Sequence, residues 1–273
     1  MMIVFTNLDS CLINQDNDYK LALPVIEKLK TKGIPLILVT SKTRAEVEDL
    51  RTTLGLSDPF IVENSSAIFI PQSDRSWKTA EATLESDYYV KTFGCNYIEA
   101  RAGLKIIQST LKIPNLKGFG DFEDTKIQSL IGISKKAAKK AKTREFSEPF
   151  ITPQDIDTSE LNNTAAEFGF KILSGSFGGD RFNFMILGIN VSQGKAVQWL
   201  IDNYQPKTIE EPIITLGLGT SSQDGEMLEK MDTAVVIINT TETSPSLDNK
   251  EWQTTNSPGI QGWAEAITKI CQL

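Results

Sequence analysis

The fold is decided by residues 3 to 12, which read Ile3-Val4-Phe5-Thr6-Asn7-Leu8-Asp9-Ser10-Cys11-Leu12. The apolar residues at the start of this stretch predict a short buried strand, and the polar residues after them predict a turn. In an open α/β sheet, ligands bind at the edge formed by the carboxyl ends of the strands. Asn7 and Asp9 are therefore the first candidates for a functional site.

Outward from this stretch, apolar periodicity predicts two series of helices and strands. The first series has helices over 21–32 and 45–54 and strands over 34–39 and 59–62. The second has helices over 191–204, 225–231 and 263–271, strands over 213–218 and 234–238, and a polar surface excursion over 240–257. Alternation of this kind predicts a parallel sheet with right-handed crossovers.

The region between the two series has a different character. From about residue 75 to 187, short mixed strands surround a helical segment at 134–142 that is rich in lysine and alanine. A chain that leaves an α/β core and returns to it indicates an inserted domain. We therefore expect an α/β core formed by residues 1–78 and 188–273, with an α+β cap of residues 79–187 inserted between them.

Composition excludes several classes of function. A net charge of −7 argues against a nucleic-acid partner and against a basic membrane-binding face. The chain has no histidine, which removes histidine-dependent nucleophilic catalysis and histidine-bound metals. Its three cysteines are widely spaced and predict neither a disulfide framework nor a zinc site. No apolar run is long enough for a membrane span, and the widely spaced cysteines favour a reducing, cytoplasmic location.

Several motifs, taken in order, resemble one known family. They are the first stretch quoted above, Val39-Thr40-Ser41-Lys42-Thr43-Arg44-Ala45-Glu46-Val47, Pro59-Phe60-Ile61-Val62-Glu63-Asn64, Lys142-Thr143-Arg144-Glu145-Phe146-Ser147-Glu148-Pro149, Gly178-Gly179-Asp180-Arg181-Phe182 and Ser257-Pro258-Gly259-Ile260-Gln261-Gly262-Trp263. They resemble the mannosyl-3-phosphoglycerate phosphatases, a capped branch of the haloacid dehalogenase (HAD) superfamily. The resemblance spans the whole chain.

The resemblance implies a HAD-like, Rossmannoid parallel sheet with an inserted cap, and a magnesium-dependent phosphatase site. It implies that position 7 holds the nucleophile, that Asp9 is the general acid/base, and that position 193 holds a lysine near the phosphate. Metal ligands are implied at Asp9, Asp224 and position 220. Substrate contacts are implied at Thr40, Ser41, Lys42, Asn64, Arg144, Glu145, Ser147, Gly179 and Arg181.

This chain departs from the family pattern at the positions that carry the chemistry. The nucleophile position holds Asn7, the lysine position holds Gln193, and a metal-ligand position holds Thr220. Ser10 and Cys11 replace the Gly-Thr of the first motif, Ser65 and Ser66 replace two glycines, and Gln223 replaces an asparagine. Only Asp9, Thr40 and Asp224 keep the expected catalytic residue types.

These changes predict a loss of catalysis. An aspartyl-phosphate intermediate requires a carboxylate nucleophile, and the Asn7 amide is a poor one. Magnesium prefers charged oxygen ligands, so two neutral side chains in place of two carboxylates predict weak magnesium binding or none. Asp224 is equally well explained as the N-cap of the helix that follows it.

Three functions remain open at this stage. The first is a pseudophosphatase that retains binding of a phosphorylated sugar or an acidic small molecule, or that regulates a protein partner. Thr40, Ser41 and Lys42 would serve such binding, because they stand where a strand ends and a helix begins. The second is an active magnesium-dependent phosphomonoesterase that uses Asp9 and Asp224 with water as nucleophile. The third is a protein-interaction scaffold with an empty cleft.

Overall fold

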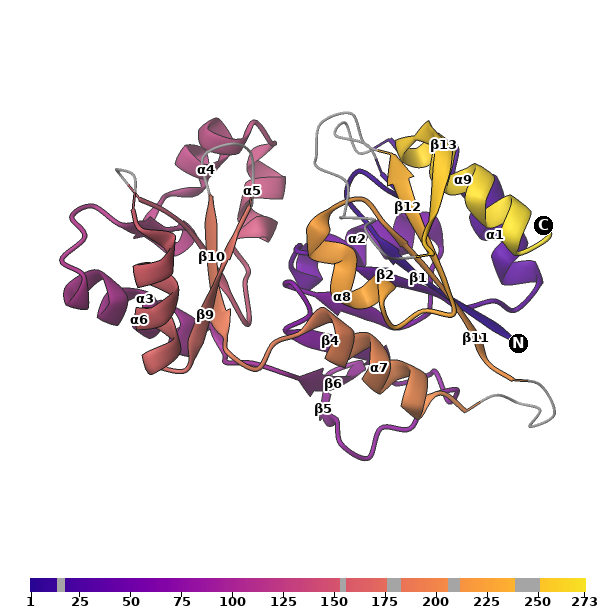
Figure 1. Cartoon of the computed structure of the whole chain (residues 1–273), viewed down its shortest axis with the longest axis horizontal. Coiled ribbons are helices and arrows are strands. Elements are labelled where there is room, and N and C mark those ends of the chain that lie inside the picture. The colour runs from indigo at the N-terminus through magenta and orange to yellow at the C-terminus, as the bar shows by residue number, and fades with distance from the viewer. Residues whose placement is uncertain (14–17, 153–155, 176–182, 206–211, 239–250) are drawn as a thin grey trace.

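The computed structural model of the chain describes residues 1–13, 18–152, 156–175, 183–205, 212–238 and 251–273. The chain forms two lobes that lie side by side, and both chain termini lie in the larger lobe (Figure 1). We call the lobe that contains both termini the core and the lobe formed by the middle of the chain the cap. An α/β core of this kind confirms the fold class expected from the sequence.

The core is built on one sheet. Within the described residues its strand order is β13-β12-β11-β1-β2-β3-β4-β6-β5. The strands are β1 (Met2–Asn7), β2 (Leu36–Val39), β3 (Phe60–Val62), β4 (Ala67–Pro71), β5 (Thr83–Glu85), β6 (Tyr88–Thr92), β11 (Ile214–Gly219), β12 (Thr233–Ile238) and β13 (Gln253–Pro258). Pairing is parallel from β13 to β3 and antiparallel from β3 to β5.

Helices cover both faces of this sheet (Figure 1). Apolar residues of α1 (Leu23–Thr31), α2 (Arg44–Leu54) and α9 (Gly259–Ile270) pack against one face. Those of α7 (Gln193–Asn203) and α8 (Gly225–Leu228) pack against the other. Successive side chains of β1 point to opposite faces, with Val4 in the first cluster and Phe5 in the second, as a strand buried on both faces requires.

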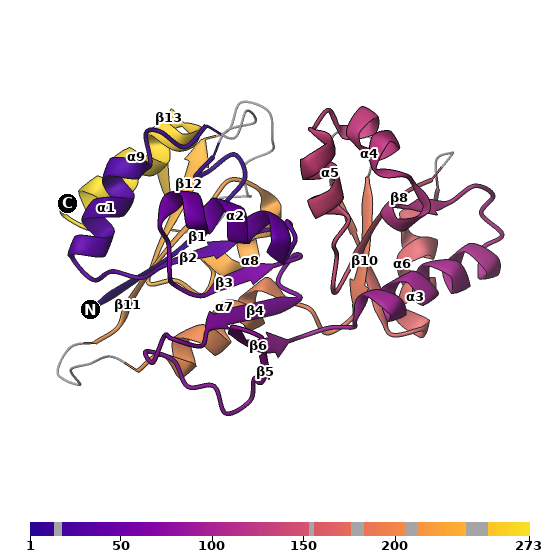
Figure 2. The same cartoon turned by 180° about the vertical axis from the view of Figure 1, so that it is seen from behind.

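The cap has its own smaller sheet. Within the described residues its strand order is β7-β8-β10-β9, and all its pairs are antiparallel. Its elements are α3 (Tyr97–Thr110), β7 (Lys117–Gly118), α4 (Asp124–Ile131), α5 (Lys135–Ala141), β8 (Glu148–Ile151), α6 (Thr158–Glu167), β9 (Phe170–Ser174) and β10 (Phe184–Gly188). Helices α3 and α6 cover the face away from the core, while α5 lies nearer the core (Figure 2).

The chain crosses between the lobes twice, and the two crossings touch each other. A Cβ atom added at Gly94 would lie 2.5 Å from Val191 Cγ2, and one added at Gly188 would lie 2.6 Å from the backbone N of Cys95. Both distances are too short for a real contact. Glycine is therefore needed at both positions, because the two connecting backbones pass in direct contact.

The boundary expected at residues 78 and 79 falls too early in the sequence. Strands β5 and β6 pair with β4, so the core sheet continues to Thr92. We propose that the cap begins near residue 93 and ends at Gly188, because all its strands lie between those two positions. The sequence misled here because β5 is short and its side chains are exposed, so it lacks the apolar run of the other core strands.

The polar excursion expected at residues 240–257 is wrong in its last part. Residues 239–250 lie outside the described residues, but Gln253–Pro258 forms β13, a strand at the edge of the core sheet. An edge strand can be polar because its outer side faces solvent, and here only Thr255 is buried. The predicted helix over 225–231 is shorter than expected and ends at Leu228.

None of the helices among the described residues is both long enough and apolar enough to cross a membrane.

Candidate functional site

The candidate site lies where the central parallel strands end. Strand β1 lies between β11 and β2, and their register pairs Thr6 with Leu218 and Asn7 with Val39. The residues that follow each strand, Thr40 and Thr220 among them, therefore come together with Asn7 at one edge of the sheet. This is the edge that the sequence indicated.

A cavity of about 610 Å³ opens at this edge. Its core wall contains eight of the candidate residues, namely Asn7, Asp9, Thr40, Ser41, Asn64, Gln193, Thr220 and Asp224. Its opposite wall comes from the cap, where Lys171, Leu173 and Ser174 of β9 face the core. The structure thus gathers most of the candidates around one space between the two lobes, although their roles in ligand binding stay predictions.

Asn7 and Asp224 are joined by a short hydrogen bond. Asn7 Nδ2 donates to Asp224 Oδ1 at 2.6 Å, while Asn7 Oδ1 accepts from the backbone N–H of Asp9 at 3.1 Å. Both ends of the amide therefore have partners that fit only in this orientation. A carboxylate at position 7 would place two negative oxygens together, so asparagine suits the arrangement as it stands.

Asp224 is buried and surrounded by hydrogen-bond donors. Its Oδ2 accepts from the backbone N–H of Thr220 at 2.8 Å and of Ser221 at 3.0 Å. The side chain of Gln193 donates to the same carboxylate. Burial raises the pKa of Asp224, and the hydrogen bonds oppose the rise only in part. Its side chain does not cap the following helix, so the capping role left open by the sequence is not observed.

The side chain of Asp9 contacts Lys42 and Thr40, whereas its backbone N–H donates to Asn7. Lys42 Nζ lies 2.9 Å from Asp9 Oδ1, and Thr40 Oγ1 donates to Asp9 Oδ2 at 3.3 Å. Burial lowers the pKa of Lys42, but the charges of Asp9 and Glu46 and the hydrogen bond to Asp9 together outweigh that effect, and the pKa is raised overall. Thr40 Oγ1 in turn accepts from the backbone N–H of Lys42 at 3.1 Å. The Lys42 and Thr40 side chains that were expected to bind an anion thus contact a carboxylate of the protein itself.

A further carboxylate, that of Glu226 in α8, lies against the start of α7. Glu226 Oε2 accepts from Ser192 Oγ at 2.6 Å and from the backbone N–H of Gly194 at 3.3 Å. A negative charge is favoured at the N-terminus of a helix. Lys171 of the cap donates from Nζ to the backbone oxygen of Val191. Burial lowers the pKa of Lys171, and the charge of Glu226 opposes that change.

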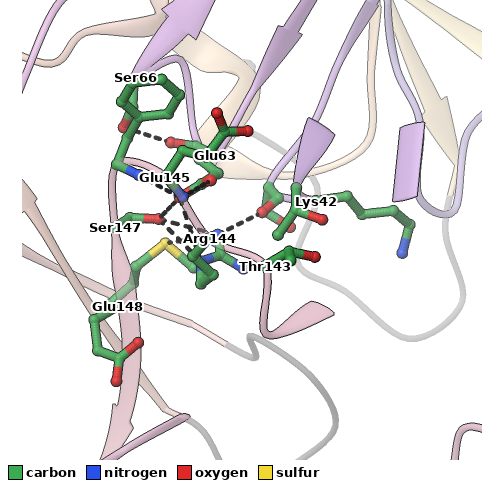
Figure 3. A network of polar contacts seen from close by, with 12 residues as sticks. Lys42, Glu63, Ser66, Thr143, Arg144, Glu145, Ser147 and Glu148 are labelled. Atoms are coloured by element: carbon green, nitrogen blue, oxygen red, sulfur yellow. Dashed lines mark hydrogen bonds and ion pairs between the residues drawn. The ribbon is translucent and has the colours of Figure 1, made fainter. Parts of the chain in front are cut away.

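A separate polar network joins the cap to the core (Figure 3). Glu63 is fully buried, and its carboxylate accepts from the backbone N–H groups of Glu145 at 2.7 Å and Phe146 at 3.1 Å and from Ser147 Oγ at 2.6 Å. Arg144 Nε lies 3.4 Å from Glu63 Oε2, and Arg144 Nη2 donates to the backbone oxygen of Ser41 at 2.9 Å. We call these residues the Glu63 network.

The structure therefore separates the sequence candidates into two groups. Arg144, Glu145 and Ser147 do not line the cavity, because their polar atoms hold the cap against the core. Glu145 also pairs with Arg44, with 3.0 Å between Arg44 Nε and Glu145 Oε1. Gly179 and Arg181 lie outside the described residues.

Sequence reasoning missed Lys171, Leu173 and Glu226. A signal for the first two was present, because Phe170 and Ile172 alternate with them and pack into the cap. That alternation turns Lys171 and Leu173 to the opposite face of the sheet, toward the core. Glu226 gave no such signal, since one acidic residue near a helix start is common.

Comparison with known proteins identifies the family. The family model described as haloacid dehalogenase-like hydrolase matches residues 4–262. The chain belongs to the haloacid dehalogenase-like hydrolase family. The resemblance drawn from the sequence motifs is confirmed.

Within the HAD family, the chain is similar to phosphatases over nearly its full length. It is 37% identical to the glucosyl-3-phosphoglycerate/mannosyl-3-phosphoglycerate phosphatase of Persephonella marina, over 98% of this chain and 97% of that protein. It is 34% identical to the phosphatase of the same name from Methanococcoides burtonii, over 98% and 96%. Among solved structures, a Thermoplasma acidophilum protein shares the fold with a TM-score of 0.68 at 16% identity, covering 100% of this chain and 99% of that one.

HAD phosphatases generally use magnesium, but the side chains at this edge do not fit that ion. Both oxygens of Asp224 already accept hydrogen bonds, and Asn7 directs an N–H at that carboxylate. Asp9 is paired with Lys42. The described residues hold no cluster of three or more acidic, cysteine or histidine side chains that would suit a metal. Magnesium prefers charged oxygen ligands, and the two carboxylates nearest Asn7 are already held by Lys42 and by backbone N–H groups.

Proposed function

We propose that this protein is a pseudophosphatase of the HAD family. In this proposal it binds an acidic sugar derivative of the kind on which its relatives act, in the cavity between core and cap. It does not hydrolyse that compound at the rates of an active phosphatase, and it binds magnesium weakly or not at all. The ligand class rests on the names of the relatives, which act on glucosyl- and mannosyl-3-phosphoglycerate.

The hydrogen bond of 2.6 Å between Asn7 Nδ2 and Asp224 Oδ1 is the observation that supports this proposal. In the family pattern, position 7 carries the attacking carboxylate. Here it carries an amide whose two ends are both engaged within the protein. The amide carries no negative charge and its oxygen already accepts the backbone N–H of Asp9, so it is a poor nucleophile toward phosphorus.

The absence of the lysine that the family pattern has at position 193 also supports a loss of catalysis. Phosphoryl transfer depends on cations that stabilise the charge on the equatorial oxygens. Position 193 carries a neutral glutamine that donates to Asp224, and the remaining acids at the edge are engaged by lysine or by backbone N–H groups. The amides of Asn7 and Gln193 thus stabilise Asp224 in place of charged partners.

The test is phosphate release from glucosyl- and mannosyl-3-phosphoglycerate in millimolar magnesium, with the Persephonella marina phosphatase assayed beside it. We expect release to be slower by roughly 10³-fold or more, because removal of a nucleophile together with its electrostatic partners costs at least that much. Calorimetric titration with magnesium should give no saturable heat.

Release that approaches the rate of the relative, and that disappears in Asp9→Ala, would contradict the proposal and establish an active phosphomonoesterase. A saturable magnesium titration would contradict its metal-free part alone. If no small molecule of this class stabilises the protein, the cavity is not a binding site and the function lies in contacts with another protein.

A further inference from the structure

The polar atoms of the cavity wall decide what kind of group can bind there. A phosphate at the edge of an α/β sheet is normally held by backbone N–H groups, hydroxyl groups, helix N-termini and lysine or arginine. Besides the hydroxyl groups of Ser41 and Ser222, the core wall of this cavity has such donors in three places. Each of these places already holds a carboxylate of the protein.

The first place is the end of β2. Thr40 Oγ1 donates to Asp9 Oδ2, and Lys42 Nζ lies 2.9 Å from Asp9 Oδ1. An external phosphate would have to displace the Asp9 carboxylate, which stands 43% exposed beside the cavity. The charge that Lys42 would lend to a ligand is thereby neutralised.

The second place is the end of β11, and the third is the start of α7. At the end of β11, the backbone N–H groups of Thr220 and Ser221 both donate to Asp224 Oδ2. At the start of α7, the Glu226 carboxylate accepts hydrogen bonds from Ser192 Oγ and from the backbone N–H of Gly194. Neither place has these donors free for a ligand.

What remains on the core wall is rich in acceptors. The carboxylates of Asp9 and Glu226 keep unused lone pairs. Acceptors of this kind repel a phosphate dianion, whereas they pair with O–H groups.

We propose that the cavity selects the unphosphorylated form of the sugar ligand, with hydroxyl groups of the ligand set against the core wall. This inference rests on the proposed function and narrows its ligand to a polyhydroxylated sugar acid that carries no phosphate. Hydroxyl groups donate to Asp9 and Glu226, and the cation Lys171 on the cap wall faces the other side of the ligand. Such a protein binds what its phosphatase relatives release.

The test compares two compounds that differ only in the phosphate. Glucosyl-3-phosphoglycerate and the same compound without its phosphate are titrated into the whole protein by calorimetry, in a buffer with EDTA so that no metal-dependent hydrolysis takes place. We expect the unphosphorylated compound to bind at least about tenfold more tightly, which corresponds to about 1.4 kcal/mol. Inorganic phosphate alone should not compete with it.

A charge-removing variant tests the cause. Asp9→Asn keeps the shape of the side chain but releases the charge of Lys42, so the phosphorylated compound should gain about tenfold in affinity. The unphosphorylated compound should not gain affinity and should lose up to about tenfold, because its hydroxyl group then donates to a neutral amide oxygen in place of a carboxylate. Glu167→Gln, at the exposed end of α6, is the matched control and should leave both affinities unchanged. Melting temperatures of the variants report whether each is folded.

Equal or tighter binding of the phosphorylated compound by the unaltered protein overturns the inference, and so does failure of both compounds to bind. An Asp9→Asn protein that keeps the original preference overturns the assigned cause. Phosphate release in the separate magnesium assay overturns the proposed loss of catalysis instead, and it leaves the ranking of affinities measured in EDTA standing.

Discussion

A single amide group decides how the edge of the sheet is organised. Asn7 accepts a hydrogen bond from the backbone of Asp9 with one end and donates to Asp224 with the other. The exchange of one oxygen for a nitrogen turns a repulsive pair of acids into a hydrogen-bonded pair. The substitution therefore stabilises the protein without a metal, whatever it does to catalysis.

Restoring the acid should destabilise the protein. In Asn7→Asp, the new carboxylate lies against the buried carboxylate of Asp224, so the pKa of one of the two is raised. A raised pKa in the folded protein gives stability that is present at low pH and is lost as pH rises. We expect a loss of roughly 1–3 kcal/mol at pH 7 that is largely recovered near pH 5, measured by urea unfolding across that range.

The control for this variant is Asn7→Ala, which removes the hydrogen bond without adding charge. Its loss of stability should vary less between pH 5 and pH 7 than that of Asn7→Asp, because the lost hydrogen bond raises the pKa of Asp224 but no second carboxylate is added. If Asn7→Asp is as stable as the unaltered protein at pH 7, the site tolerates the second charge, and the amide at position 7 is not what stabilises Asp224.

At this scale, the sequence predicted residue types well and contacts poorly. The neutral residues at positions 7, 193 and 220 were evident from the motifs. That Asp9 fills the cradle of Thr40 and Lys42 was not, because an ion pair depends on side-chain rotamers at the ends of two different strands. The sequence likewise predicted a ligand contact for Arg144, because it could not show that the Arg144 side chain pairs with Glu63.

The turn between β3 and β4 shows how an element carries strain. Glu63, Asn64 and Ser65 all have positive φ angles, of 49°, 57° and 71°. Side chains with a Cβ rarely adopt this region, and glycine adopts it freely. The family pattern has glycines at positions 65 and 66, where this chain has serines. The buried Ser65 hydroxyl also makes no hydrogen bond within the described residues.

Returning glycine to this turn should have opposite effects at its two serines. Ser65→Gly relieves a positive φ and removes an unpartnered hydroxyl, so it should stabilise the protein by about 1 kcal/mol. Ser66→Gly removes the hydrogen bond from Ser66 Oγ to the backbone oxygen of Glu63, at 2.7 Å, and relieves nothing. It should destabilise by about 1–2 kcal/mol. Guanidinium unfolding of both variants measures the difference, and effects of the same sign would refute this explanation.

Elements with a strong pattern were predictable, and elements held by pairing alone were not. Strand β2 and helix α2 have the apolar periodicity that burial demands, and both were expected within a few residues. Strands β5 and β13 are largely exposed and exist because a neighbouring strand offers hydrogen bonds. A sequence read locally does not contain that information.

For the whole molecule, the Glu63 network governs how the two lobes meet. It joins a turn of the core to the backbone of cap residues 145 and 146, and Arg144 completes it from the cap side. A buried acid without its counter-charge is costly, and the loss of one partner typically removes about 3–5 kcal/mol. The position of the cap over the cavity therefore depends on residues that touch no ligand.

Arg144→Leu should weaken the contact between the lobes. We expect a loss of about 3–5 kcal/mol and a larger radius of gyration by small-angle X-ray scattering, because the cap is released from the core. Arg101→Leu is the control. It breaks ion pairs with Asp121 and Glu148 inside the cap, 2.7 Å each, and should lower stability without a change in radius. An unchanged radius in Arg144→Leu would show that other contacts fix the cap.

The order of strands in the core sheet also determines when each strand can pair during translation. Strand β1 emerges first during translation, yet its neighbour β11 begins only at Ile214. At roughly 5–20 residues per second, the intervening chain takes about 10–40 s to synthesise. The strands of the cap, by contrast, are consecutive along the chain and are complete once Gly188 has emerged. Between the emergence of Gly188 and that of β11, a nascent chain carries a finished cap beside a strand β1 that has β2 as a neighbour but still lacks β11.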